Sequence, residues 1–126
     1  MTTATRPIPT IAVFPEEQLT LDQRIEKWVY FYMRALEDNY LSQQRSTFAD
    51  SPVTFRLETG RKYYKVVQND GGVHAFVDRK TGEVYKPASW KSPAKHVRFD
   101  LRIINDRELL HNPKFTDWAG GYLYMR

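Results

Sequence analysis

The sequence predicts an α+β fold, in which one long N-terminal helix packs on an antiparallel sheet of five to six strands that could curl toward a small barrel. Two observations indicate this fold. Apolar residues recur at helical spacing over residues 20–44, and the period changes to two after Pro52. The length of 126 residues is that of one ordinary domain, so we expect residues 1–126 to share a single core.

Residues 1–18 are predicted to form an extended, proline-rich arm. Pro7, Pro9 and Pro15 each fix φ and lack an amide donor, which argues against a regular helix. The short apolar run Ile11–Phe14 could dock on the body of the domain or on a neighbouring subunit, and docking on the body is the simpler expectation.

The long helix is expected over residues 20–44, with helical geometry from Leu21 to Gln43. Thr20 and Gln23 have the spacing of a capping box. One face of this helix is apolar and consists of Ile25, Trp28, Val29, Tyr32 and Leu36. Tyr30, Phe31 and Met33 lie off that face, so the helix is either covered on more than one side or presents a surface to a partner.

Residues 53–126 are predicted to be mainly β structure. Four strands are expected over residues 53–58, 62–68, 73–77 and 83–86, separated by turns that contain glycine, asparagine or aspartate. A fifth strand is expected over residues 97–103 and a helical turn over residues 105–110. The aromatic tail 117–124 could add an edge strand. Short connections between successive strands predict an antiparallel meander.

Positive charge is concentrated in the middle of the chain. Residues 61–102 carry 10 Lys/Arg and 4 Asp/Glu, whereas residues 1–60 carry 6 and 8, and residues 103–126 carry 3 and 3. Such a local excess can attract a polyanion, for example nucleic acid, acidic lipid or an acidic protein. The same charge could instead solubilise a sheet edge or pair with the acidic side chains of the helix.

The sequence carries no strong catalytic motif, so we expect no enzymatic activity, no metal and no cofactor. It has no cysteine and no glycine-rich phosphate loop, and its three histidines are not at metal-ligand spacing. Glu58, Asp78 and Lys80 match a loose nuclease template, but a hairpin turn already explains Asp78 and Lys80. No apolar run approaches the roughly 20 residues that cross a bilayer, so no membrane partner is expected.

Basic and aromatic residues interleave through residues 61–102, a combination typical of proteins that bind single-stranded nucleic acid. Cations neutralise phosphates, and rings stack on unpaired bases at roughly 1–3 kcal/mol per base. Tyr63 and Tyr64 are adjacent on a predicted strand, so one of them must point away from the core. The predicted phosphate contacts are Lys62, Lys65, Lys86, Lys91, Lys95, Arg98 and Arg102. The predicted stacking residues are Tyr64, Tyr85 and Trp90.

Each of these rings could alternatively fill the small core while the lysines keep the outer surface wet. Trp90 lies in the loop between Lys86 and Lys95, which contains Pro87 and Pro93. A stiff loop could present Trp90 for base stacking or for a protein contact, or the indole could plug one end of the sheet.

The block from Val73 to Lys95, VHAFVDRKTGEVYKPASWKSPAK, resembles one in small uncharacterised proteins of tailed bacteriophages, including cyanophages. The ending Asp117–Tyr124 is similar to the way in which such proteins close, and the likeness extends over about residues 61–126. The resemblance implies a viral origin and, from that, the cytoplasm of the host cell as location. It implies no chemistry.

The expected function is that of a non-enzymatic phage accessory protein that binds nucleic acid, with single-stranded DNA or RNA favoured. The alternative is a protein-interaction module, either a minor virion component or an effector that binds a host protein, which could also form a homo-oligomer. Its surfaces would be the run Ile11–Phe14, the helix around Tyr30 and Phe31, and the tail around Tyr122 and Tyr124.

Overall fold

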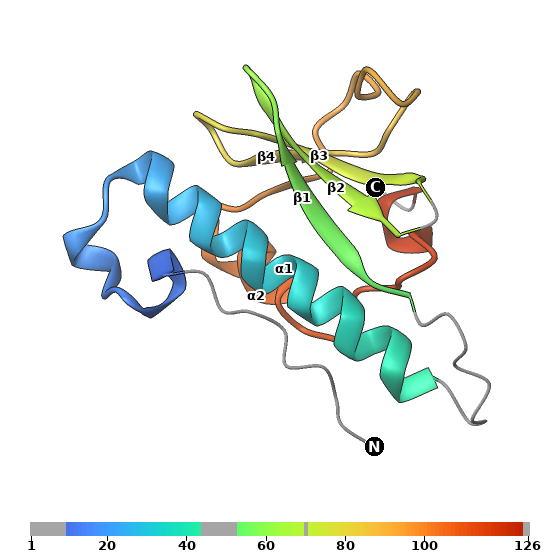
Figure 1. The fold of residues 1–126 in the computed structure, drawn as a ribbon, viewed down its shortest axis with the longest axis horizontal. Coiled ribbons are helices and arrows are strands. Elements are labelled where there is room, and N and C mark those ends of the chain that lie inside the picture. Colours follow the sequence, from blue (N-terminus) through green and yellow to red (C-terminus); the bar gives the residue numbers. More distant parts are fainter. Residues whose placement is uncertain (1–9, 44–52, 70, 125–126) are drawn as a thin grey trace.

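In the computed structural model, one long helix lies across one face of a five-stranded antiparallel sheet (Figure 1). The structure describes residues 10–43, 53–69 and 71–124. The predicted α+β class and the helix-on-sheet arrangement are confirmed. Helix α1 (Leu21–Gln43) matches the predicted helical span, and residue 44, the last of the wider prediction, lies outside the described residues.

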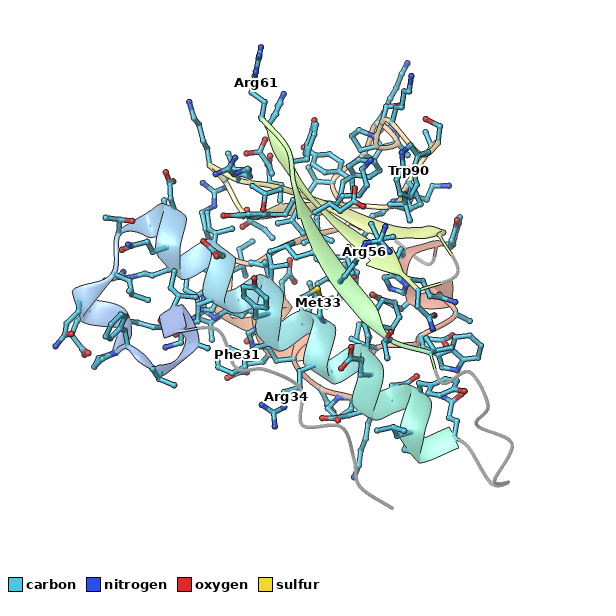
Figure 2. The ribbon with its side chains drawn as sticks, in the orientation of Figure 1. Phe31, Met33, Arg34, Arg56, Arg61 and Trp90 are labelled. Carbon is cyan, nitrogen blue, oxygen red and sulfur yellow. The ribbon has the colours of Figure 1, made fainter. Side chains whose placement is uncertain are left out.

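The capping box at the start of α1 forms as predicted. The backbone N–H of Thr20 donates to Gln23 Oε1 at 2.9 Å, and the backbone N–H of Gln23 donates to Thr20 Oγ1 at 3.2 Å. Ordinary helical periodicity then separates the two sides of the helix. Met33 is buried and points toward the sheet, whereas Arg34 is exposed and points away from it (Figure 2).

The sheet is a meander with the strand order β1-β2-β3-β4-β5, and all neighbours are antiparallel. Its strands are β1 (Phe55–Thr59), β2 (Tyr63–Gln68), β3 (Val73–Asp78), β4 (Glu83–Tyr85) and β5 (Phe99–Asp100). Strands β1 and β5 are the two edges, so the sheet is open. The register shifts between Val66 and Val67, where a bulge opposes β3.

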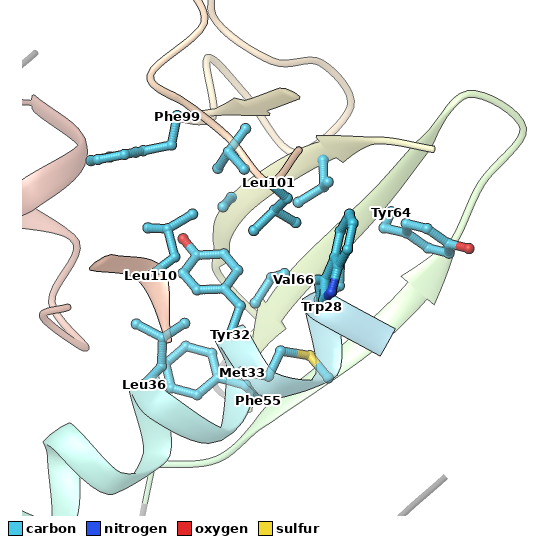
Figure 3. Close-up of a cluster of buried hydrophobic side chains, with 14 of the residues drawn as sticks. Trp28, Tyr32, Met33, Leu36, Phe55, Tyr64, Val66, Phe99, Leu101 and Leu110 are labelled. Atoms are coloured by element: carbon cyan, nitrogen blue, oxygen red, sulfur yellow. The ribbon is translucent and has the colours of Figure 1, made fainter. Parts of the chain in front are cut away.

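The core lies between α1 and the sheet and is closed by the C-terminal third of the chain (Figure 3). Tyr32 and Leu36 of α1 meet Phe55 and Val66 of the sheet, and Leu110 of helix α2 (Ile104–Leu110) joins the same cluster. Fully buried side chains on α1 include Ile25, Val29, Tyr32 and Leu36. These residues belong to the apolar face that the sequence predicts.

The prediction of an extended arm was wrong for residues 10–18. Thr10–Val13 forms the 3-10 helix η1 and Glu16–Gln18 forms the 3-10 helix η2. Pro15 precedes η2 with φ −59°, a value that the proline ring favours. The residue before a helical turn needs no amide hydrogen, so proline is tolerated there. Residues 1–9 of the predicted arm lie outside the described residues.

The aromatic tail adds no edge strand. Gly120 has φ +89° and its N–H donates to the Asp117 carbonyl, after which Gly121–Tyr124 forms the 3-10 helix η3. Both Tyr122 and Leu123 are buried. A strand would direct these adjacent side chains to opposite faces, whereas a helical turn lets both reach the core.

The fifth strand is shorter than predicted because the chain turns after Asp100. The Asp100 carboxylate accepts the backbone N–H of Arg102 at 2.8 Å, which is typical of an Asx turn. Helix α2 starts at Ile104, where the sequence predicts a helical turn.

Candidate nucleic-acid interface

The face of the sheet that points away from α1, called the outer face below, carries a cluster of aromatic rings. Tyr63 of β2, Phe76 of β3 and Tyr85 of β4 share this face because strand side chains alternate. The Tyr63 ring centroid lies 5.7 Å from that of Phe76 and 6.1 Å from that of Tyr85, both in edge-to-face geometry. Lys65 is paired with Phe76, and Phe76 with Tyr85, in the strand register.

The loop after β4 folds back and presents Trp90 to the outer face. Its base is closed by the Pro87–Pro93 bridge and by the N–H of Ala94, which donates to the Lys86 carbonyl at 2.9 Å. Figure 2 shows Arg61 and Trp90 on the side of the sheet opposite α1. The indole is 43% exposed and therefore does not plug the end of the sheet.

Lys65 joins the loop to the sheet. Its Nζ lies 4.1 Å from the Trp90 ring centroid and 5.7 Å from that of Phe76, within the range of cation–π contacts. Lys62 makes a similar contact with Tyr63 at 5.4 Å. Two of the predicted cations, Lys62 and Lys65, therefore lie beside flat rings on the outer face.

A pocket of about 250 Å³ opens beside this cluster, at the β1–β2 hairpin. It is lined by Glu58, Thr59, Gly60, Arg61, Lys62, Tyr63, Lys65, Phe76 and Lys91. Four of these side chains are cationic and one is a carboxylate, so the pocket has a positive potential suited to an anion.

The prediction that Tyr64 stacks on a base was wrong. Tyr64 is only 3% exposed and faces the core beside Val66, while the Arg79 guanidinium lies 5.1 Å from its ring (Figure 3). Burial raises the pKa of its hydroxyl. Tyr63, the neighbour that the sequence analysis left out of the site, takes the outward position instead. Alternation could show that one tyrosine faces out, but not which.

Tyr85 lies on the outer face as the stacking role requires, but it is half-buried. Its hydroxyl donates to Glu83 Oε1 at 3.2 Å. Burial, together with the charge of Glu83, raises the pKa of Tyr85 to about 12. The ring therefore supports Tyr63 at its edge and offers less area to a base than Trp90 does.

The predicted phosphate contacts separate into two groups. Lys62, Lys65 and Lys91 line the pocket, and Lys95 is exposed at the end of the Trp90 loop. Lys86 follows Tyr85 in the chain and lies elsewhere, with its Nζ 4.3 Å from the Tyr124 ring centroid.

Arg98 and Arg102 lie near β5, away from the pocket lining. Arg98 is half-buried just before the strand. Arg102 forms a salt bridge of 2.8 Å with Asp100, and this partner raises the pKa of the guanidinium. Burial raises the pKa of Asp100, but the hydrogen bonds from Arg102 outweigh that effect and hold it below its usual value. A neighbouring carboxylate already compensates the charge of Arg102, which weakens its case as a phosphate contact.

A separate group of polar side chains lies inside the core. Tyr122 bonds through its hydroxyl to His74 Nε2 at 2.7 Å and to the hydroxyl of Tyr32. Burial lowers the pKa of His74 to about 4 and raises the pKa values of both tyrosines. All three side chains are buried, so we assign this chain of hydrogen bonds to stability and not to a reaction.

Two further features of the described residues bear on the class of site. Within residues 10–43, 53–69 and 71–124, no group of three or more His, Cys, Asp or Glu residues could hold a metal ion. Over the same described part of the chain, no helix combines the length and apolar character needed to span a bilayer.

Comparison with known protein families matches residues 12–125 to DUF7717, a family of unknown function. The comparisons with curated proteins and with solved structures each found no match. The family match covers the helix, the whole sheet and the C-terminal turn, so it extends over all of the elements that build the outer face. The chain belongs to the DUF7717 family.

Proposed function

We propose that the protein binds single-stranded nucleic acid through its outer face and acts as a non-enzymatic accessory protein. The observation that carries this proposal is the position of Lys65 beside the exposed Trp90, with Nζ 4.1 Å from the ring centroid. Lys65 occupies one face of the indole, so a base would stack on the opposite face while the same cation meets the adjoining phosphate.

The shape of the outer face favours unpaired over paired strands. Rings stack only on bases whose faces are open, whereas sequence in a duplex is read mainly by a helix or ribbon inside the major groove. The outer face presents a sheet surface and one stiff loop. Arg61, Lys62, Lys65 and Lys91 supply the cations, and Lys95 extends the charge along the loop.

The biological setting belongs to the same proposal. The resemblance of residues 73–95 to proteins of tailed bacteriophages supports a viral origin and, from that, a location in the cytoplasm of the infected cell. No cofactor is required for this function, because binding uses only side chains of the chain itself.

The test is binding of fluorescently labelled short oligonucleotides, measured by anisotropy at increasing salt. If four cations neutralise phosphates, the affinity should fall about fiftyfold between about 50 and 200 mM salt, from a slope of roughly 0.7 per phosphate for single strands. Trp90→Ala should weaken binding by about fivefold to a hundredfold, because stacking contributes roughly 1–3 kcal/mol per base.

Phe14→Ala is the matched control, because Phe14 is also an exposed ring but lies between η1 and η2, beside α1 and not on the outer face. Lys65→Gln should reduce the salt slope by about 0.7, whereas Lys114→Gln, an exposed lysine in the C-terminal third, should leave it unchanged. Absence of binding at low salt, or equal losses for Trp90→Ala and Phe14→Ala, contradicts the proposal.

The second candidate function is a protein-interaction module, and one observation favours it. Val13 is 66% exposed and the neighbouring Phe14 is also exposed, an apolar pair at the surface near the start of α1. The other surfaces expected for this function are partly covered, since Tyr122 is buried and Tyr30 and Phe31 are half-buried, whereas Tyr124 is exposed. A defined oligomer in light scattering that Val13→Ser with Phe14→Ser dissociates would favour this function over nucleic-acid binding.

A further inference from the structure

The pocket at the β1–β2 hairpin has two chemically different sides. Arg61, Lys62 and Lys91 are exposed cations at its rim. Glu58 of β1 lies opposite Lys65 in the strand register and provides the carboxylate of the lining. A phosphate would be attracted to the rim and repelled by Glu58, so a ligand with one anionic and one neutral end has a defined orientation here.

The size of the pocket limits what can enter. Sites for drug-sized ligands have volumes of roughly 300–1,000 Å³, and this pocket of about 250 Å³ falls just below that range. It therefore suits a single nucleotide unit and not a stack of several bases. Tyr63 offers the ring that such a base would meet, since it is half-buried, whereas Phe76 is only 2% exposed.

Glu58 is positioned to contact the edge of that base. Its Oε2 forms a salt bridge of 2.8 Å with Arg56 Nη2, two residues earlier on the same face of β1, which orients the carboxylate and compensates part of its charge. A carboxylate can accept hydrogen bonds but cannot donate them. It therefore pairs with the amino group of cytosine or adenine, and it repels the carbonyl oxygen that thymine or uracil presents at the equivalent position.

We propose that this pocket binds one nucleotide of the strand, holds its phosphate at Arg61, Lys62 and Lys91, and uses Glu58 to prefer an amino-bearing base over thymine or uracil. This inference rests on the proposed function, because it adds a preference among bases to the same outer face. Lys65 lines the pocket and its Nζ also lies 4.1 Å from the Trp90 ring centroid, so the next base of the strand would stack on the indole while Lys65 contacts the intervening phosphate.

The test compares labelled homopolymers of deoxycytidine, deoxyadenosine and deoxythymidine at neutral pH and equal salt. The wild-type protein should bind the first two at least about fivefold more tightly than the third, the lower end expected for one good contact between a side chain and a base edge. Glu58→Gln should bring all three affinities within about twofold of one another, because an amide can both donate and accept.

Glu83→Gln is the matched control. Like Glu58, Glu83 lies in the sheet, where it is part of β4, and its replacement by glutamine changes the net charge by the same amount. It does not line the pocket. It should strengthen binding of all three homopolymers alike and keep their ranking. Equal affinities in the wild-type protein, or loss of the ranking in Glu83→Gln as well, would overturn the inference while leaving nucleic-acid binding intact.

Mononucleotides test nucleotide binding in the pocket separately from strand binding by the outer face. Amide resonances of residues Thr59–Tyr63 should shift on addition of dCMP and much less with dTMP, and this result supports the pocket even if no oligonucleotide binds. Failure of every oligonucleotide overturns the proposed function. If dCMP leaves these resonances unchanged at millimolar concentration, the pocket is not a nucleotide site.

Discussion

Protonation of His74 should destabilise the folded protein in mild acid. The imidazole is buried between Tyr32, Phe55 and Tyr122, and burial lowers its pKa to about 4, although the nearby charge of Asp117 opposes the shift. In the unfolded chain the ordinary value of 6.5 applies. Below pH 6.5 the unfolded chain therefore binds a proton that the folded protein excludes, and the free energy of unfolding falls as the pH falls toward 4.

The size of this effect follows from the gap between the two pKa values. At about 1.36 kcal/mol for each pKa unit, the stability lost between pH 6.5 and pH 4 is roughly 3 kcal/mol. That is a large part of the roughly 5–15 kcal/mol by which a domain is stable. Above pH 6.5 both states of the chain hold a neutral His74, so this contribution is constant there.

Urea denaturation at a series of pH values, followed by tryptophan fluorescence, measures the effect. The comparison is between the wild-type protein and His74→Gln, whose amide can still bond to the Tyr122 hydroxyl at neutral pH. The difference in unfolding free energy between the two should change by about 3 kcal/mol across this pH range.

Two further variants separate the contribution of His74 to acid sensitivity from that of the other histidines. Burial also lowers the pKa of His111, so His111→Gln should remove part of the acid sensitivity while His74 still contributes its own share. His96→Gln removes an exposed imidazole and controls for histidine loss itself. If the curves for the wild-type protein and His74→Gln run parallel from pH 7 to 4, the reasoning from burial is refuted.

Three other variants test packing, backbone conformation and charge. Leu36→Ala, at a fully buried position, should cost about 2–5 kcal/mol of unfolding free energy in urea titrations, and a smaller loss would mean that the core collapses around the cavity. Gly82→Ala should cost about 1–2 kcal/mol because φ is +77°, and Gly71→Ala, where φ is +95°, should cost a similar amount, since the new Cβ at either position would meet nothing closer than 3.4 Å. Arg102→Ala should weaken oligonucleotide binding less than Lys65→Ala in anisotropy titrations, because Asp100 already compensates its charge; equal losses would contradict that reasoning.

Local signals account for the parts of the fold that were predicted well. The capping box at Thr20 and Gln23 marks the start of α1, and its bonds involve residues only three apart. The β3–β4 hairpin is equally local, since the Asp78 carboxylate accepts the N–H groups of Lys80 and Thr81, and Gly82 supplies the positive φ. Such features need no information from distant residues.

The predictions failed at segments whose conformation is set by contacts with residues distant in the sequence. The tail around Tyr122 has the β-forming composition of an edge strand, but the Tyr122 hydroxyl finds His74 and Tyr32 in the core, 48 and 90 residues earlier in the chain. Similarly, the segment before α1 is held by Trp28, whose indole N–H donates to Glu16 at 3.0 Å. Secondary-structure propensity depends on a residue and its near neighbours and does not reflect such distant partners. Tertiary contacts therefore override it here.

The amino-acid sequence alone determined that one long helix and a meander of strands form, and that cations and rings interleave along the middle of the chain, because these properties depend on spacing and nearby turns. Only the tertiary structure decided that Tyr63 faces outward and Tyr64 inward, and that Lys65 meets Trp90. It also decided that Arg102 is paired with Asp100. The physical reason is that alternation along a strand defines two faces, but the helix that packs on one of them decides which face stays open to a ligand.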